Sequence, residues 1–415
     1  MLRKSRLCDT VALAILKLAV GMSGSGKPRE TLFTQNYIII CLINLFIVIS
    51  SFPLVAILPL YLRDNVTPNT TLTGLIIGIF PFCALLSRFF AGWALDNFRI
   101  KPLFAAALLG YSLFFLVYPW VFSVPLFLIL RAAHGFIFGV AMTAAAVIRV
   151  LPLSRRGEGV GYFSISLSLG MAAGPFIALK IITQFSFLAL FIFFTVLILA
   201  GWGALVWRVK LSEVGHRERK PFAWSDLFLK RALSLVVNVF VINTVYAGLV
   251  AFVVLYAVNL NYSDAVVSMF FLIMSLVMLC SRLFAGRILD ARGPRLISSC
   301  GIVVLGVGSL LMAWTPGVAV FLLGGVCVGL GVGILFPVLQ TMINNMVQPR
   351  QQGVANASYY VGLDFGWVCG TTLSGFVVGL SSIAGAYVMN AGLCVAALVL
   401  FLTLNLKHYN LHKVC

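Results

Sequence analysis

Long apolar runs separated by short polar connections occupy nearly the whole chain. A helix of about twenty apolar residues crosses the hydrocarbon core of a bilayer. Runs of this length lie at roughly 37–62, 74–95, 103–122, 125–148, 157–180, 184–207, 231–257, 265–287, 295–314, 318–341, 352–376 and 384–406. The pattern therefore predicts an all-α integral membrane protein with twelve transmembrane helices.

A stretch of ten residues near the end of the second predicted helix occurs again in the second half of the chain. SRFFAGWALD at 87–96 and SRLFAGRILD at 281–290 agree at seven of ten positions and lie 194 residues apart. The same offset relates two glycine pairs, Gly135 with Gly329 and Gly139 with Gly333. Duplication in so apolar a chain is typical of transporters whose halves face each other across a pathway, so we predict two pseudo-symmetric six-helix bundles.

The polar segments divide the chain into five parts. We expect a cytoplasmic tail at 1–36, a six-helix bundle at 37–207, a basic cytoplasmic linker at 208–230, a second bundle at 231–406 and a tail at 407–415. The first thirty residues begin like a signal peptide, but Lys17 interrupts their apolar run and no clear cleavage site follows. We expect either a disordered tail or a true start at Met22.

The composition excludes several classes of protein. With 61% hydrophobic and 10% charged residues, nearly every residue is used by the membrane, which leaves no room for a soluble catalytic domain, and we expect no enzyme activity. The cysteines are scattered, and no C-x-x-C pair, His/Cys cluster or phosphate-binding loop occurs. We therefore expect no cofactor and no metal site.

The net charge of +18 has a topological explanation. If both termini are cytoplasmic, the 29 Lys and Arg lie in the inner loops and tails, with five exceptions. Arg63 and Lys180 fall on the outer side of the membrane, and Arg88, Arg131 and Arg282 lie within helices. This is the positive-inside bias, which sets orientation and needs no nucleic-acid partner.

Each copy of the repeated stretch combines a small Ala-Gly pair with a carboxylate where the helix reaches the cytoplasm. The small residues let a neighbouring helix approach closely. Asp96 and Asp290 can then accept hydrogen bonds from the positive N-terminus of another helix, but only when the inner ends of the halves meet. We expect a latch that stabilises one access state.

These stretches resemble the loop signature G-x-x-x-D-R/K-x-G-R-R/K of the major facilitator superfamily. The second copy fits well. The first keeps Gly92, Asp96 and Lys101 and departs from the signature at Asn97, Arg99 and Ile100. The residues expected to form the two latches are Arg88, Gly92, Asp96, Lys101, Arg282, Gly286, Asp290, Gly293 and Arg295.

Arg131 lies inside the apolar run of the fourth predicted helix, where a charge is costly unless it is paired or hydrated. His134 follows three residues later on the same helix face. With Gly135, these residues resemble the family's R-x-x-Q-G signature, with His in place of Gln, and the resemblance implies a role in proton transfer. The alternative is an arginine bonded to backbone carbonyls, with a histidine that satisfies it.

The fifth predicted helix has its small residues at the spacing G-x8-G-x3-G-P, namely Gly161, Gly170, Gly174 and Pro175. Such glycines clear one helix face for a packed neighbour, and the proline bends the helix. The spacing resembles the family's antiporter signature, which implies exchange of a drug-like molecule for protons and favours efflux. Simple close packing is the alternative.

Asp364 is the one acidic residue that falls in the middle of a predicted helix. Burial and a nearby arginine act in opposite directions on its ionisation, so it can titrate near ambient pH, as a proton carrier must. The alternative is an acid that fixes helix packing. Polar and aromatic residues expected to line the substrate cavity are Asn44, Asn238, Asn243, Tyr246, Tyr359, Tyr360 and Trp367.

The chain resembles, over about 37–406, the bacterial efflux permeases of this superfamily grouped with arabinose, multidrug and metallophore exporters. The resemblance implies a secondary transporter that exchanges a small organic molecule for protons by alternating access. We expect a monomer in the plasma (bacterial inner) membrane, in contact with lipid, with Asp364, Arg131 and His134 in proton coupling. A proton-coupled importer of a sugar or organic acid, and a non-transporting sensor or channel, remain as alternatives.

Overall fold

The computed structural model describes residues 32–97, 99–142, 156–210, 230–347 and 352–412, which are helical apart from short connections and contain no strand. The N-terminal half holds α2 (Gln35–Asn65), α3 (Thr70–Asn97), α4 (Ile100–Val117), η1 (Tyr118–Trp120), α5 (Val124–Ala141), α7 (Arg156–Gln184) and α8 (Phe187–Arg208). The C-terminal half holds η4 (Lys230–Ala232), α9 (Leu233–Asn259), α10 (Asp264–Ala313), α11 (Val318–Asn344), α12 (Gln352–Leu380), α13 (Ile383–Leu400), η6 (Phe401–Asn405) and α14 (Leu406–His412).

Eleven segments of the described chain are long and apolar enough to cross a membrane. The 29-residue α7 occupies the place of the remaining predicted span, and its stretch Leu169–Gln184 is also apolar. The predicted all-α membrane fold is confirmed.

Two predicted spans, 265–287 and 295–314, meet in the 50-residue α10, which bends at one residue. Gly293 has φ +74° and ψ 171°, a backbone conformation that side chains with a Cβ rarely adopt, and Pro294 follows it. Gly293 therefore forms the turn between the eighth and ninth spans.

Two helix ends differ from the prediction. The helix α5 ends at Ala141 rather than near 148, and 143–155 lie outside the described residues. At the other end of the chain, α13 continues through the π-helical η6 and then α14 to His412. The segment predicted as a tail from 407 is therefore helical as far as His412.

The two halves repeat the same helix contacts, as the duplication predicts. Gly139 of α5 lies against Ser87 and Ala84 of α3, so closely that a Cβ would overlap them. The equivalent Gly333 of α11 lies in the same way against Ser281 and Met278 of α10. Each of these four partners is 194 residues from its counterpart, so the sequence repeat is a structural repeat.

The second repeated contact is between the first and fifth helices of each half. Gly170 and Gly174 of α7 pack on Val48 and Pro53 of α2. In the C-terminal half, Gly366 and Gly370 of α12 pack in the same way on Asn243, Thr244 and Ala247 of α9. Both halves therefore hold their fifth helix against their first by the same glycine spacing.

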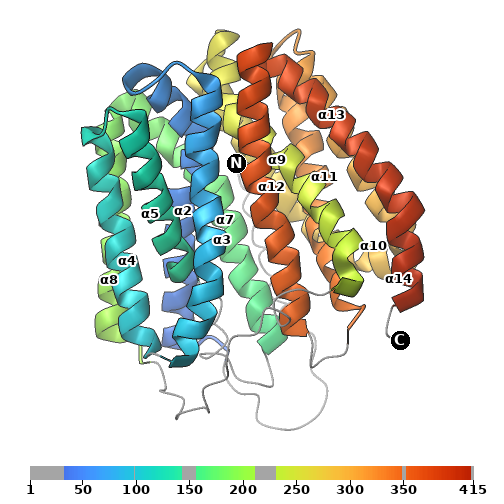
Figure 1. The fold of residues 1–415 in the computed structure, drawn as a ribbon, viewed down its shortest axis with the longest axis horizontal. Coiled ribbons are helices and arrows are strands. Elements are labelled where there is room, and N and C mark those ends of the chain that lie inside the picture. The colour runs from blue at the N-terminus through green and yellow to red at the C-terminus, as the bar shows by residue number, and fades with distance from the viewer. Residues whose placement is uncertain (1–31, 98, 143–155, 211–229, 348–351, 413–415) are drawn as a thin grey trace, which may run out of the picture.

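The halves lie side by side, with α3 and α12 next to each other at their junction (Figure 1). Glycines on both helices bring the backbones together at the predicted outer end. A Cβ on Gly74 would be 2.6 Å from the carbonyl oxygen of Thr371, and one on Gly375 would be 2.6 Å from that of Thr70. We refer to this contact of Gly74, Gly78, Gly375 and Gly379 as the outer seal.

The central helices are also enclosed near that end. Every residue of α9 from Thr244 to Ala257 is buried, whereas Leu233 and Val237, near its predicted inner end, are exposed. In α2, Ile38 and Leu42 near the inner end are likewise exposed. The described part of the molecule is thus closed at the predicted outer end.

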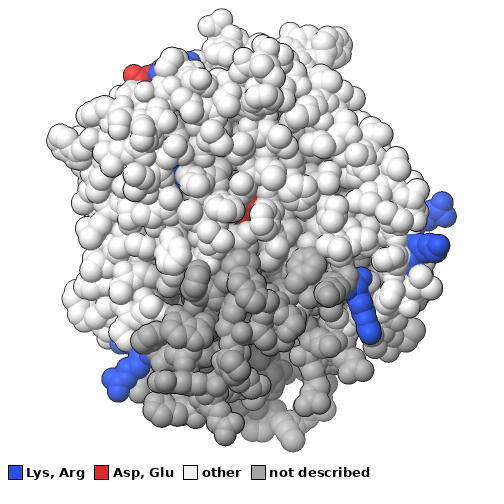
Figure 2. Space-filling view, viewed as in Figure 1, with Lys and Arg blue, Asp and Glu red and all other residues white. Residues whose placement is uncertain are grey.

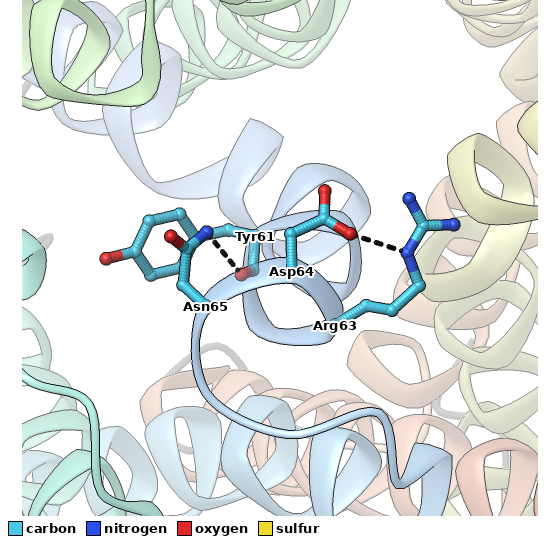
Figure 3. Close-up of polar contacts among 4 residues, drawn as sticks. All are labelled: Tyr61, Arg63, Asp64 and Asn65. Atoms are coloured by element: carbon cyan, nitrogen blue, oxygen red, sulfur yellow. Dashed lines mark hydrogen bonds and ion pairs between the residues drawn. The ribbon is translucent and has the colours of Figure 1, made fainter.

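Charged side chains mark the ends of the helices. On the face shown in Figure 2, the described part carries few charged atoms: most lie toward the edges, and only traces of blue at the upper left and of red near the centre show between them. At the last turn of α2, Arg63 Nε donates to the neighbouring Asp64 at 2.8 Å, and Asn65 Nδ2 donates to the carbonyl of Tyr61 at 2.9 Å (Figure 3). Such an exposed ion pair contributes about 0–1 kcal/mol, so it indicates a solvated helix end rather than a source of stability.

Candidate functional site

An aromatic cluster lies where the halves meet, and residues of both halves contribute to it. The ring of Tyr246 on α9 is 5.8 Å from that of Trp367 on α12 and 6.0 Å from Phe336 on α11. Phe52 of α2 meets Trp367 edge to face at 6.1 Å, across the boundary between the halves. This cluster, Phe52, Tyr246, Phe336 and Trp367, is the central aromatic cluster.

Asp364 is next to this cluster in the middle of α12. Its side chain is 7% exposed. Tyr360 and Trp367 are one helical turn away in either direction, hence on the same helix face. A carboxylate at such depth costs about 2.5–3.5 kcal/mol on insertion scales, so its place in the helix needs a functional or pairing reason.

The α12 backbone at this point is held by α9. Asn243 Nδ2 donates to the carbonyl of Leu363, the residue before Asp364. Gly366 lets the two backbones approach, since a Cβ there would be 2.7 Å from that of Asn243. The carboxylate is therefore carried on a stretch of helix whose position relative to α9 is well defined.

Arg282 faces tyrosines of two other helices. Its guanidinium interacts electrostatically with Tyr359 and Tyr360 of α12 and with Tyr246 of α9. It is partly buried within the α10 span Asp264–Leu289. The repeat motif predicts a latch role for this arginine, and its charge also lies near Tyr246, Tyr359 and Tyr360, which we expect to line the substrate cavity.

The Tyr246 hydroxyl is buried, and no hydrogen-bond partner for it occurs among the described residues. The same holds for the side-chain oxygen of Asn243. Tyr359, by contrast, donates to the carbonyl of Phe336 at 3.2 Å and joins α12 to α11. The Tyr246 hydroxyl and the Asn243 side-chain oxygen therefore have unused hydrogen-bonding capacity inside the junction.

Arg131 lies apart from this junction, inside the N-terminal half. It is 1% exposed, and its Nη1 donates to the Tyr118 hydroxyl at 3.1 Å. Its guanidinium lies 4.2 Å from the Phe80 ring centre, and Nε donates to the carbonyl of Ile76 at 3.4 Å. This charge contacts a hydroxyl, a carbonyl and an aromatic face of its own half.

His134 shares Tyr118 with Arg131, as their common helix face predicts. Its Nδ1 is 2.6 Å from the Tyr118 hydroxyl. Aromatic rings surround the imidazole, with Phe114 stacked at 5.1 Å and Tyr111 at 4.6 Å. Neither the sequence period nor a motif identifies Tyr118 as the shared partner, because it comes from the connection between α4 and α5.

Two of the residues expected in the cavity instead join neighbouring helices. Asn44 of α2 donates to the Ser166 hydroxyl of α7 at 2.8 Å. Asn238 of α9 donates to the carbonyl of Ala397 on α13 at 2.9 Å and is fully buried. Both carboxamides thus stabilise packing within one half, and we leave them out of the proposed substrate site.

The latch residues are only partly within the described structure. Arg88, Gly92, Asp96 and Asp290 lie in helices, but their side chains and surroundings are outside what the structure describes. Lys101 donates to the carbonyl of Val206 on α8 at 2.9 Å, which joins α4 to α8. Gly286 and Gly293 face open space, and Arg295 is exposed. The latch stays a prediction.

In the antiporter-type helix, the packing of Gly170 and Gly174 on α2 is the geometry expected from their spacing, with Pro175 beside it in α7. The surroundings of Gly161 lie outside the described residues.

Among the residues described, no three His, Cys, Asp or Glu side chains come together where they could hold a metal ion.

Comparison with known proteins agrees with this architecture. The family model described as Major Facilitator Superfamily matches residues 40–297 and 259–411. The chain belongs to the major facilitator superfamily. It is a multi-pass membrane transporter, in keeping with the paired halves and the junction between them.

Several members of the superfamily are similar to this transporter. An uncharacterised MFS-type transporter of Methanocaldococcus jannaschii is 25% identical over 333 residues, 77% of this chain and 85% of that protein. The staphylopine export protein of Staphylococcus aureus is 21% identical over 363 residues, 83% of this chain and 89% of that protein. The crystal structure of a bacterial homologue of the human lysosomal transporter Spinster, inward-facing and occupied, has a TM-score of 0.71 at 12% identity and covers 93% of this chain and 97% of that one.

Proposed function

We propose that this transporter exports a small organic molecule in exchange for protons, by alternating access between its two halves. The observation that carries the proposal is Asp364, a buried acid in the middle of α12, one turn from the central aromatic cluster. An acid there can hold a proton in one access state and release it in the other.

Two features support export rather than import. The glycines of α7 have the spacing expected of antiporters and pack closely on α2. A relative at 21% identity is named an export protein. Both observations concern only the direction of transport, which is tested by an experiment of its own.

The energy of a proton gradient is sufficient for this exchange. One charge that moves down 100 mV releases about 2.3 kcal/mol. This corresponds to a concentration ratio of roughly fifty for a neutral solute. The proposal therefore needs no nucleotide hydrolysis.

We place Arg131 and His134 in a supporting role within the same proposal. Their shared bond to Tyr118 keeps a positive charge inside the N-terminal half, next to α3 of the outer seal.

The transporter acts as a monomer in the plasma (bacterial inner) membrane, with lipid around its apolar surface and both termini cytoplasmic.

The experiment uses everted membrane vesicles that contain the transporter and a fluorescent reporter of lumenal acidification. Candidate cargo added to energised vesicles is expected to release protons, and Asp364→Asn is expected to abolish this release. Asp264→Asn, which removes an exposed acid at the start of α10, is the matched control and should behave as wild type.

Proton release by Asp364→Asn at the wild-type rate would show that another group carries the proton. Cargo uptake into right-side-out vesicles together with protons would show import and overturn the direction that we propose.

A further inference from the structure

The Tyr118 hydroxyl lies between a buried arginine and a buried histidine, and these two contacts determine where its proton points. Arg131 Nη1 is 3.1 Å from the oxygen, and His134 Nδ1 is 2.6 Å from it. A guanidinium can only donate, so the oxygen accepts from Arg131. The phenol proton then points to His134, where Nδ1 accepts it. A proton on Nδ1 would instead leave the phenol proton without an acceptor among the described residues, which is costly for a buried group.

The other ring nitrogen of His134 lies in surroundings that suit a donor. A neutral imidazole whose Nδ1 accepts carries its proton on Nε2. Nε2 is buried and makes no well-formed hydrogen bond among the described residues, although the imidazole also interacts with the backbone of Tyr111. A backbone carbonyl accepts, and an aromatic face also attracts an N–H. The Phe115 ring stands at 89° to the imidazole with its centre 4.9 Å away, so an N–H fits here better than a lone pair.

A second proton on the imidazole is incompatible with this arrangement. It would occupy Nδ1, break the bond from Tyr118 and place a second positive charge beside Arg131. A fully buried cation needs a compensating partner, and His134 is 0% exposed. Its ring contacts within the described part of the chain are with Phe80 of α3, with Tyr111, Phe114 and Phe115 of α4, and with Tyr118 of η1, and none of these is an acid.

Arg131 connects these hydrogen bonds to α3. Its Nε donates to the carbonyl of Ile76 at 3.4 Å, and its guanidinium lies 4.2 Å from the centre of the Phe80 ring. Ile76 lies between Gly74 and Gly78, whose backbone meets α12 in the outer seal. The hydrogen bonds that begin at the imidazole therefore end on the part of α3 that closes the predicted outer end.

We propose that His134 is a neutral hydrogen-bond acceptor, protonated at Nε2, and that through Tyr118 it positions Arg131 against α3 so that the outer seal closes. His134 is thus a positioning residue and not a proton carrier, in contrast to the role in proton transfer that the helix signature implies. The inference goes beyond the proposed function, which assigns the proton to Asp364 and gives His134 no defined chemistry. It depends on neither the cargo nor the direction of transport.

The first test records ¹⁵N NMR spectra of the purified full-length transporter in detergent, with its histidines labelled. The ring signals that disappear in His134→Asn are those of His134. We expect one acceptor-type and one N–H-type nitrogen, both unchanged from about pH 5 to about pH 8, the range in which an ordinary histidine changes charge. The exposed His408 of α14 is the internal reference, because water reaches its ring.

The second test determines whether the acceptor at this position is needed for closure. Spin labels at Asn69 and Ser382, in a background without native cysteines, report the ratio of molecules closed and open at the outer end. His134→Leu removes the acceptor and is expected to lower this ratio by about tenfold, the effect of roughly one lost hydrogen bond to a network with a charged member. His134→Asn keeps an acceptor oxygen and should restore most of the closed fraction. His408→Leu is the matched control and should leave the ratio unchanged.

Tyr118→Phe removes the connecting hydroxyl and should lower the ratio as His134→Leu does, so the positioning role is tested even if His134→Leu does not fold. A His134 signal that moves with pH, or a proton on Nδ1, would overturn the neutral acceptor. Equal ratios in His134→Leu and His134→Asn, or a wild-type ratio in Tyr118→Phe, would overturn the positioning role. Neither measurement uses cargo or a gradient, so its failure is distinct from proton release that persists in Asp364→Asn.

Discussion

At the scale of single residues, the buried Arg131 shows how a hydroxyl, a carbonyl and an aromatic ring accommodate a charge inside a helix bundle. The guanidinium uses one hydroxyl, one carbonyl and one aromatic face, all supplied by the N-terminal half. Tyr118 is the critical member, because its hydroxyl also meets the His134 imidazole. Removal of this hydroxyl leaves two buried polar groups each short of one partner.

We expect Tyr118→Phe to lower the free energy of unfolding by about 1–2 kcal/mol, the range for hydrogen bonds between transmembrane helices and to charged groups. Unfolding in mixed detergent micelles measures this change. Tyr256→Phe is the matched control, since its hydroxyl has only a 3.5 Å contact with Thr315, and it should cost clearly less. Equal losses for the two variants would mean that the hydrogen bonds of Tyr118 add no more to the free energy of unfolding than the long contact of Tyr256.

At the scale of helices, close approach depends on glycines that face a neighbouring backbone. The outer seal is the clearest case between the halves, because Gly375 of α12 would place a Cβ 2.9 Å from the Cα of Gly74 on α3. Flexible side chains cannot relieve an overlap with backbone atoms, so the helices themselves must separate. A state closed at this end thus requires small residues on both helices.

We expect Gly375→Leu to force the outer ends apart and to favour the outward-open state. Spin labels at Asn69 and Ser382, in a background without native cysteines, should report a longer distance between the halves than in the parent protein. Gly392→Leu adds the same bulk to α13, where nothing lies within 4 Å, and should leave the distance unchanged. An unchanged distance in Gly375→Leu would mean that α3 and α12 do not seal this end.

Much of this element level was predictable from sequence, because helix length, glycine spacing and the repeat are local patterns. The offset of 194 residues correctly relates Gly139 to Gly333 and also their partners on α3 and α10. Gly293 was expected to follow the eighth span, and its positive φ forms the turn. These features depend on chain geometry rather than on which distant helix lies opposite.

The candidate site was less predictable, because facing partners come from separate helices. Helical period placed Arg131 and His134 together but did not reveal Tyr118. Motif spacing assigned Arg282 to a latch, while its tyrosine partners on α9 and α12 depend on how three helices pack. Asn238 is a polar residue within an apolar helix, as a cavity residue would be, yet its side chain donates to α13.

For the whole molecule, the meaning of the closed end depends on orientation in the membrane. The halves meet at the end that holds residues 66–69, and that end faces outward if both termini are cytoplasmic. The exposed arginines near the bend of α10, Arg287, Arg292 and Arg295, lie at the opposite end and follow the positive-inside bias. With this orientation, the structure is sealed toward the outside.

We expect alkaline phosphatase, which is active only outside the cytoplasm, to be active when inserted in 66–69 and inactive when fused after Cys415. Green fluorescent protein at the C-terminus should fluoresce, because it folds in the cytoplasm. The two reporters are complementary, so a protein that fails to insert is distinguished from one that inserts the other way round. Active phosphatase at the C-terminus would show that the molecule has the opposite orientation in the membrane, and the outer seal would then close the cytoplasmic side.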